Sequence, residues 1–322
     1  MNSIFYGEMT EFLSLREKGL AHSTVTMDRC ALLSFDRHLV KRKKCEMSID
    51  EEDVATWIQP MHGSLTRNTI ASKIRILRMF LYHLQNKGIP VYIPRYIKVP
   101  DTYIPHLFSD AEIQAIFIAA DFIPHRKKST HAIVLPMVLR MLYSCGFRLG
   151  ELLSIRVGDI DFKRGLVLLR NTKNQKQRVV PLGNALTEMV YKYCLAMGVM
   201  ERAENYIFPG KGRTKHISQR AIQEWFETLL KDTGIFVRTK KRSRGPCLHC
   251  FRHLFSVKSF AQAERAGRSV NDSIPYLSVY LGHNNLAETE KYLKFNSDIF
   301  QEHTVLFEDF SEGIFPEVCY EE

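Results

Sequence analysis

Apolar positions in the first 87 residues recur with a helical period. From Thr66 to Lys87 they return every three or four residues along one face, and Gly88 follows where helices commonly end. Upstream, Ser48 and Glu51 have the spacing of a capping box, which predicts a short helix that begins there and stops near Pro60. The pattern predicts a helical domain over residues 1–87.

Prolines interrupt this pattern between residues 88 and 107. Proline at this density breaks helices and favours extended chain, so residues 88–107 are predicted to be a linker. A second capping box, formed by Ser109 and Glu112, then predicts the start of another domain. The four prolines are Pro90, Pro94, Pro100 and Pro105.

The second domain is predicted to be helical with one small sheet. An apolar stretch from Ala132 to Tyr143 predicts a buried helix, and three short runs joined by turns predict neighbouring strands. The predicted strands are 159–162, 166–169 and 178–181, and further helices are predicted near 184–198, 217–231 and 249–264. The expected fold class is mainly α with a small three-stranded antiparallel β-sheet.

Composition narrows the class of protein. The chain of 322 residues is 45% hydrophobic and 25% charged, which is typical of a soluble globular protein. No apolar run approaches the ~20 residues of a membrane span, and the N-terminus lacks the pattern of a signal peptide. Seven scattered cysteines, an odd number, favour reduced thiols. We therefore expect a cytoplasmic protein without a membrane partner.

Charge is distributed unevenly along the chain. The net charge is +10, but residues 295–322 contain eight acidic residues and no Lys or Arg. The preceding part therefore carries 45 basic and 27 acidic residues, a net charge of +18. This surplus favours a polyanionic partner such as nucleic acid, and a solvated basic surface is the competing interpretation. The basic run 41–44 has the same two interpretations.

Candidate catalytic residues lie from the middle of the chain to its last third. Arginine presents a planar fork that pairs with phosphate oxygens, histidine moves protons, and a tyrosine hydroxyl can attack phosphorus. His249 and Arg252 lie one helical turn apart, so both can project from one face. Together these residue types suggest metal-free chemistry on a phosphodiester. The set is Arg148, Lys173, His249, Arg252, His283 and Tyr292.

Each candidate has an ordinary interpretation when taken alone. Lys173 and Lys176 compete within the predicted hairpin turn, and a turn lysine is usually only solvated. Tyr292 competes with Tyr276 and Tyr280, and an aromatic side chain at helical spacing most often belongs to the core. The order and spacing of all six residues favour a common site.

Two neighbouring features leave alternatives open. Glu151 is either an ion-pair partner that orients Arg148 or an ordinary carboxylate at a helix start. Cys247 and Cys250 form a Cys-x-x-Cys around His249, but a zinc site would need a second pair of ligands. We favour two small buried helix residues over a redox pair, and we predict neither a metal nor a cofactor.

The motifs resemble those of the tyrosine recombinases, or phage integrase family, and the resemblance covers nearly the whole chain. Residues 146–152 look like the first arginine motif, and residues 172–182 are similar to the lysine hairpin. Residues 249–253 match the His-x-x-Arg box, while residues 281–283 and Tyr292 match the closing histidine and the nucleophile.

The resemblance implies an architecture. Residues 1–87 would form a helical, SAM-like core-binding domain, residues 88–107 a linker, and residues 108–296 the catalytic domain. The two domains would form a C-shaped clamp on DNA. Residues 297–322, an acidic tail with interleaved phenylalanines, would dock on a neighbouring protomer, although the tail could instead fold back on its own domain. No segment precedes the core-binding domain, so we expect no arm-binding module.

The resemblance also implies roles. Tyr292 would attack the scissile phosphate and become joined to the DNA 3′ end, Lys173 would protonate the departing 5′ oxygen, and His249 would act as a base or proton shuttle. The groups expected to stabilise the transition-state charge are Arg148, Arg252 and His283. Because the phosphotyrosyl bond keeps the energy of the phosphodiester, no cofactor is needed.

The implied function is site-specific DNA recombination through a Holliday junction. The expected partners are double-stranded DNA with inverted core sites and three further copies of the chain, or copies of a related recombinase, on two duplexes. The role would be integration or excision of a mobile element or resolution of DNA dimers, in the nucleoid of a bacterial or phage system. Alternatives are a monomeric type IB topoisomerase-like enzyme and a non-catalytic DNA-binding protein.

One segment departs from the family pattern. Residues 261–273 look longer than in the shortest family members, and we expect a hairpin or loop extension there that leaves the chemistry undisturbed.

Overall fold

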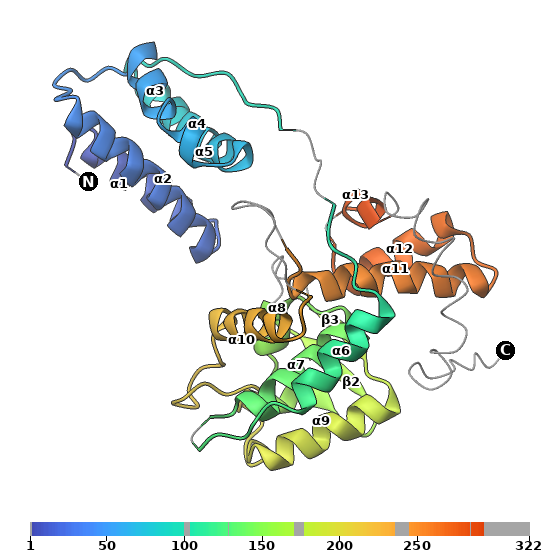
Figure 1. Ribbon diagram of the computed structural model, residues 1–322. Coiled ribbons are helices and arrows are strands. Elements are labelled where there is room, and N and C mark those ends of the chain that lie inside the picture. Colours follow the sequence, from blue (N-terminus) through green and yellow to red (C-terminus); the bar gives the residue numbers. More distant parts are fainter. Residues whose placement is uncertain are drawn as a thin grey trace. The chain divides into compact units, whose positions relative to one another are not determined.

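The computed structural model describes residues 2–99, 104–127, 129–170, 177–235, 245–283 and 285–292 (Figure 1). The chain divides into two units, Met1–Tyr103 and Ile104–Glu322, each with its own hydrophobic core. Lys173 and the predicted tail, residues 297–322, lie outside the described residues.

The first unit is a bundle of helices. They are α1 (Tyr6–Glu17), α2 (His22–Lys41), α3 (Glu51–Ile58), α4 (Met61–Ser64) and α5 (Arg67–Asn86). The apolar face predicted for α5 is buried, and the hydroxyl of Thr66 caps the helix by accepting a hydrogen bond from the Thr69 amide.

The start of α3 differs from the prediction. The capping box is formed by Asp50 and Asp53, not by Ser48 and Glu51: the Asp53 amide donates to Asp50 Oδ1 at 2.8 Å, and the Asp50 amide donates to Asp53 Oδ2 at 3.1 Å. These two carboxylates accept hydrogen bonds from the backbone amides of Asp50 and Asp53, which have no partner within the helix. The helix therefore begins two residues later than a Ser48 cap would place it.

Two residues of the basic run 41–44 serve the fold. The carboxylate of Asp53 is fully buried, with Arg42 Nε 3.1 Å from Oδ1 and Lys44 Nζ 2.7 Å from Oδ2. A buried carboxylate requires such partners, because an isolated charge is costly away from water. These two side chains are therefore engaged in an intramolecular ion-pair network.

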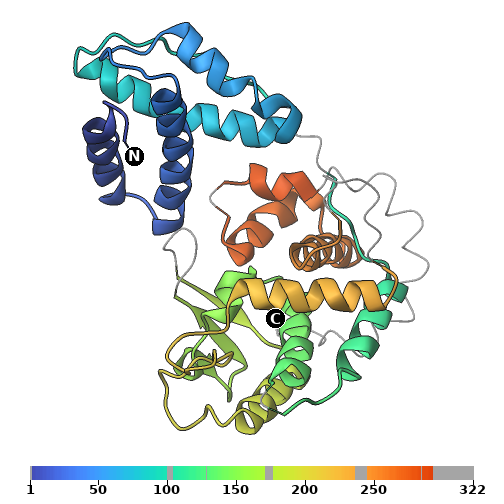
Figure 2. The same cartoon turned by 60° about the vertical axis from the view of Figure 1, so that its left-hand side comes forward.

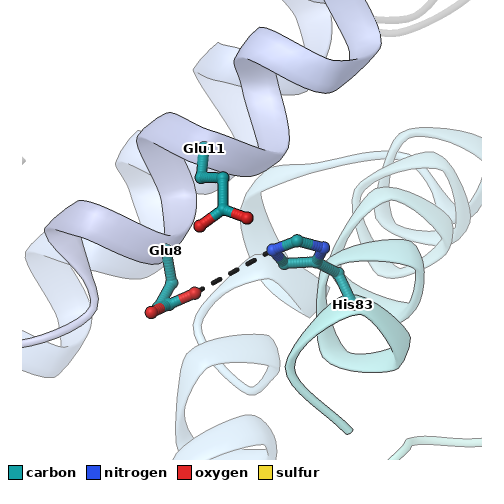
Figure 3. A group of neighbouring side chains, drawn as sticks. All are labelled: Glu8, Glu11 and His83. Carbon is teal, nitrogen blue, oxygen red and sulfur yellow. Dashed lines mark ion pairs between the residues drawn. The ribbon is translucent and has the colours of Figure 1, made fainter. Parts of the chain in front are cut away.

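A second ion-pair cluster joins α1 to α5. Glu8 and Glu11 of α1 and His83 of α5 point toward one another (Figure 3). Such groups can bind a metal ion, but here Lys87 supplies the cation, with Nζ 2.5 Å from Glu8 Oε2 and 2.7 Å from Glu11 Oε2. The cluster thus connects the two helices through an ammonium group.

The first part of the predicted linker packs against this unit. Val91 pairs with Ile49 in an isolated parallel bridge, and the Tyr92 amide donates to the Ile49 carbonyl at 2.7 Å. Arg78 of α5 donates to the Pro94 carbonyl. Extended chain through residue 97 thus belongs to the first core.

The second unit combines helices with the predicted sheet. Its helices are α6 (Asp110–Asp121), α7 (His131–Cys145), α8 (Leu149–Leu153), α9 (Asn184–Ala196), α10 (Gln219–Asp232), α11 (His249–Arg265), α12 (Val270–Leu281) and α13 (Ala287–Glu290). A 3-10 turn, Val157–Asp159, leads into β1 (Ile160–Asp161), which is followed by β2 (Leu166–Leu169) and β3 (Arg178–Pro181). The strands are antiparallel in the order β1-β2-β3, which confirms the predicted fold class.

Helix α7 is central to the second core. It contacts α6, α8, α9, α10 and α11, and most of its side chains are buried. In both views α11 and α12 lie side by side (Figures 1 and 2). Among the described residues, no helix has the length and apolar character needed to span a membrane.

The expectation of a hairpin or loop over residues 261–273 is wrong. Residues 261–265 continue α11, and α12 begins at Val270, so only residues 266–269 lie between the helices. The reason is a local cap: the Ser269 hydroxyl accepts a hydrogen bond from the Asp272 amide at 3.1 Å and starts α12 at once.

Candidate active site

Five of the six predicted site residues fall in one region of the second unit. Arg148 is the N-cap of α8, His249 and Arg252 lie on the first turn of α11, and His283 follows α12. Tyr292 follows α13. Of the predicted lysine hairpin, residues 172–182, the part that contains Lys173, residues 172–176, lies outside the described residues.

Arg252 is the most deeply placed cation of the site. It is 1% exposed, and its Nη1 and Nη2 donate to the carbonyls of Gly146 at 2.8 Å and Leu281 at 2.7 Å. Burial and the charge of Arg148 lower its pKa to about 10, while a hydrogen bond with Tyr292 acts in the opposite direction. Arg252 therefore remains charged at neutral pH.

Gly146 allows this contact. It ends α7 in the left-handed region, at φ 60°, and a Cβ there would lie 2.5 Å from a ring carbon of Phe255. Glycine is thus required both by the backbone conformation and by the close approach of α11.

Arg148 is held by a buried carboxylate. Glu151 is 3% exposed, and its Oε1 accepts from Arg148 Nη1 at 2.8 Å. The other oxygen, Oε2, accepts from Arg178 Nη2 at 2.7 Å. Burial opposes ionisation of Glu151, but hydrogen bonds and charges from Arg178 and Arg148 outweigh it and lower its pKa. Both interpretations of Glu151 hold: it pairs with Arg148, and as the third residue of α8 its Oε2 also accepts from the Arg148 amide at 3.3 Å.

His283 links the arginines to α13. Its Nε2 lies 3.1 Å from Arg252 Nη2, and its Nδ1 lies 2.6 Å from the hydroxyl of Thr289, which is fully buried. A guanidinium can only donate, so Nε2 is the acceptor and the proton sits on Nδ1, which donates to Thr289. Burial, together with the charges of the nearby arginines, lowers the pKa of His283 to about 3, and the ring is neutral at pH 7.

Tyr292 is 5% exposed and packs in an apolar cluster between α11 and α12. Its ring lies 6.0 Å from the His283 ring and 5.3 Å from the His253 ring. The two competing tyrosines differ. Tyr276 is 70% exposed, and the Tyr280 hydroxyl donates to the Cys145 carbonyl at 3.3 Å, with burial raising its pKa. Of the three tyrosines, Tyr292 is therefore the one beside His283, which hydrogen-bonds Arg252.

His249 and His253 of α11 are two further histidines of the site. Their ring centroids are 4.7 Å apart. His249 is exposed on one side but crowded by protein on the other; this desolvation and the charges of Arg252 and Arg148 lower its pKa to about 4. Burial and the neighbouring charges lower the pKa of His253 to about 4 as well, and its buried Nδ1 finds no partner among the described residues. Both rings are neutral proton acceptors at pH 7.

Three contributors were missed from sequence: Arg178, Thr289 and His253. The sequence held a signal for two of them. His253 directly follows Arg252 in the His-x-x-Arg box, and Arg178 is the first residue of the third predicted strand. Nothing in the local pattern marked Thr289, since its role depends on the turn after α12.

The cysteine pair differs from the prediction in one member. Cys250 is buried in α11, but Cys247 is exposed and precedes the helix. Their Sγ atoms lie 3.6 Å apart and form no disulfide.

The arrangement suits an anion. Arg148 Nη1 and Arg252 Nη2 both donate to the Leu281 carbonyl, at 3.4 and 2.7 Å, so two like charges are held close together before any ligand binds. Positively charged donors fixed in this way can receive the nonbridging oxygens of a phosphate.

Comparison with known proteins identifies the family. The model of the phage integrase family matches residues 109–298. A tyrosine recombinase of Pseudothermotoga lettingae is 30% identical over 233 residues, which cover 71% of each chain. A putative integrase/recombinase of Sinorhizobium fredii is 29% identical over 210 residues, which cover 62% of this chain and 64% of the relative.

The fold agrees with this assignment. The crystal structure of the XerH site-specific recombinase bound to its difH substrate has a TM-score of 0.64 at 16% identity, covering 94% of this chain and 95% of that one. With the family model matching more than half of the sequence, the chain belongs to the phage integrase family of tyrosine recombinases, which are DNA strand transferases.

Proposed function

We propose that this chain is a site-specific recombinase that cleaves and rejoins DNA through a covalent link to Tyr292. The observation that carries the proposal is the placement of one tyrosine beside His283, which in turn lies 3.1 Å from the buried Arg252. A nucleophile and a cation pair within one cluster are what phosphoryl transfer to tyrosine requires.

In the proposed cleavage step, the Tyr292 oxygen attacks the scissile phosphorus and the bond from phosphorus to the 5′ oxygen breaks. The phenolic proton passes to His249, which is neutral at pH 7 because its pKa is lowered to about 4. The 5′ oxygen takes a proton from Lys173. The nonbridging oxygens are bound by Arg148 and Arg252, and His283 supports this charge stabilisation by accepting a hydrogen bond from Arg252 through Nε2.

Rejoining reverses these steps. The 5′ hydroxyl of a partner strand attacks the phosphotyrosine, and Tyr292 leaves with a proton returned to it. The bond count is unchanged, so the exchange needs no external energy source. We infer that four copies act on two duplexes with inverted core sites, passing through a Holliday junction, or that copies of a related recombinase complete the assembly.

The domain roles follow the same proposal. Residues 1–87 would be a core-type DNA-binding domain, residues 88–107 the linker and residues 108–296 the catalytic domain. Residues 297–322, outside the described residues, would dock on a neighbouring protomer. The role would be integration, excision or dimer resolution in a cytoplasmic, nucleoid-associated setting; relatives named as integrases or recombinases and the net positive charge of residues 1–294 support action on DNA.

The test begins with a library of duplexes with randomised inverted half-sites around a spacer that is nicked at each position in turn. Cleavage beside a nick releases a short fragment and traps the adduct. Complexes that survive detergent are recovered and sequenced. The wild-type chain should enrich one inverted site, Tyr292→Phe should yield no adduct, and the control Tyr276→Phe should behave as wild type.

Two results would contradict the proposal. An adduct that persists in Tyr292→Phe would assign the nucleophile to another residue. Relaxation of a supercoiled plasmid that lacks the enriched site, by the wild-type monomer, would indicate a topoisomerase-like activity instead.

A further inference from the structure

We propose that Arg178 is a positioning residue for the reaction: it holds Glu151 so that Arg148 presents its guanidinium to the scissile phosphate. This inference rests on the proposed function. Arg178 does not itself contact the reacting atoms.

The contacts of Glu151 are divided between two arginines. Arg178 donates through Nη2 to Oε2 at 2.7 Å and through Nη1 to Oε1 at 3.3 Å, a two-pronged pair. Arg148 donates through Nη1 to Oε1 at 2.8 Å. Arg178 engages both oxygens, and the Arg148 amide also donates to Oε2 at 3.3 Å, so the carboxylate is fixed in one plane and the Arg148 guanidinium keeps a single contact to it.

This division decides what Arg148 can offer a ligand. A guanidinium carries five N–H donors. With one edge used by Glu151 and the Leu281 carbonyl, the remaining donors of Arg148 are available to phosphate oxygens. If Arg178 were absent, the Glu151 carboxylate could rotate and accept two hydrogen bonds from the Arg148 guanidinium. Those two N–H donors would then no longer be available to the phosphate.

A second contact brings Arg178 close to the turn that carries His283. Gly282 has φ 67°, and a Cβ built on it would lie 2.8 Å from Arg178 Nη1. The guanidinium therefore packs directly on the backbone beside His283. The charge of Arg178 is also among those that lower the pKa of His283, after burial and the charges of Arg252 and Arg148.

The sheet supplies a rigid base for this side chain. Arg178 is the first residue of β3, and its Cα pairs with Leu169 of β2. Its side chain is 11% exposed, and its Nε is buried without a partner among the described residues. Leaving a buried donor unpaired is unfavourable. The contacts with Glu151 and Gly282 therefore fix the guanidinium in a place where its Nε–H has no hydrogen-bond acceptor among the described residues.

The competing interpretation is that Arg178 merely neutralises Glu151. The two are distinguished by Arg178→Met, which keeps an unbranched apolar stem but removes the guanidinium, and by Arg178→Lys, which keeps the charge but not the fork. Arg170→Met is the matched control: Arg170 follows β2 on the same hairpin and pairs with the buried carboxylate of Asp159, with Nε 2.5 Å from Oδ1.

The measurements use the duplex enriched from the library, under single turnover and at saturating protein. Arg178→Met should cleave about 100-fold more slowly than wild type, as expected for a catalytic group displaced by about 1 Å. Its dissociation constant for the duplex should change little. Arg178→Lys should be intermediate, and Arg170→Met should cleave at the wild-type rate.

A second substrate separates positioning from support of the fold. In a methylphosphonate at the scissile position, a neutral methyl group replaces one charged oxygen, so cleavage depends less on Arg148. The rate deficits of Arg148→Ala and Arg178→Met, relative to wild type, should both shrink on this substrate. A general loss of structure would leave the Arg178→Met deficit unchanged.

Two outcomes overturn the inference: wild-type cleavage by Arg178→Met, or a deficit equally large on both substrates. If Arg178→Met fails to fold, Arg178→Lys carries the same comparison. Failure of the proposed function looks different, because then the wild-type chain forms no adduct at Tyr292.

Discussion

Removing the charge of Glu151 should destabilise the second unit more than any single surface ion pair does. In Glu151→Gln the side chain keeps its shape, but Arg148 and Arg178 lose their shared counterion. Both guanidiniums are largely buried, with side chains 21% and 11% exposed. Each would then carry an uncompensated charge in a poorly solvated position.

The magnitude follows from the burial of the three groups. Removing one partner of a buried ion pair costs about 3–5 kcal/mol. Because Arg148 retains some solvent and the amide oxygen of glutamine still accepts a hydrogen bond, we expect the lower end, about 3 kcal/mol. For a domain of 150–250 residues this corresponds to a fall in Tm of roughly 6–12 °C.

The two tryptophans allow the second unit to be followed alone. Trp57 lies in the first unit, and Trp225 lies on α10, stacked on His131 with ring centroids 4.4 Å apart. In a Trp57→Phe background, the fluorescence of Trp225 reports thermal and urea unfolding of the second unit. The control is Glu188→Gln, which breaks an exposed pair with Lys192 and should cost no more than about 0.5 kcal/mol.

Acidification provides an internal check. The pKa of Glu151 is lowered in the folded chain, so its stabilisation is present above the ordinary value of 4.5 and is lost as pH falls through the lowered pKa. The stability difference between wild type and Glu151→Gln should therefore shrink in acid. Equal unfolding midpoints for Glu151→Gln and Glu188→Gln at pH 7 would refute the reasoning.

Two further predictions concern the turn after α12. Gly282→Ala places a Cβ in the left-handed region, 2.8 Å from Arg178 Nη1; it should cost roughly 1–2 kcal/mol in urea unfolding and slow cleavage, and wild-type values in both assays would contradict the contact. The pKa of His283 is lowered to about 3 from 6.5, so the unfolded chain binds this proton first as pH falls, and stability is lost from about pH 6.5 downward and unaffected above it. The urea midpoint should drop more between pH 7 and 5 in wild type than in His283→Gln, and equal drops would exclude the effect.

Much of the fold was predictable because its signals are local. Strands 166–169 and 178–181 were predicted at their observed bounds, since short runs rich in apolar residues and the turn residues beside them act within a few positions. Helix starts are harder to predict from local signals. Ser48 and Asp50 are both favourable N-cap residues, and only the reciprocal hydrogen bonds between Asp50 and Asp53 identify Asp50 as the N-cap.

Site residues that belong to a sequence motif could be predicted, whereas residues whose role depends on a tertiary contact could not. Arg252 and Tyr292 could be selected from order and spacing. Arg178 and Thr289 could not, because their roles arise from segments that meet only in the folded chain: β3 with the start of α8, and α13 with the turn after α12. The sequence left two interpretations of Glu151 open, and the folded chain shows that it serves both, as a helix-start carboxylate and as the ion-pair partner of Arg148.

Helix ends explain how the charge of a buried arginine is stabilised. Gly146 and Gly282 end α7 and α12 in the left-handed conformation, and Arg252 donates to the carbonyls of Gly146 and Leu281 at these two ends. The C-terminus of a helix carries roughly half a negative charge. Two such ends offset the charge of Arg252, and among the described residues its guanidinium pairs with no carboxylate that would compete with the phosphate of the proposed reaction.

The charge balance of the site follows. Among the described residues of this cluster, Arg148, Arg178 and Arg252 each carry one positive charge and Glu151 carries one negative charge, while His249 and His283 are neutral at pH 7. The net charge is +2. A phosphodiester brings one negative charge, and more accumulates on its oxygens as the nucleophile enters, so the site is balanced toward the transition state rather than the ground state. Neutralising Glu151 would raise the net charge to +3, but Arg148 would lose the carboxylate that positions it, so cleavage should slow.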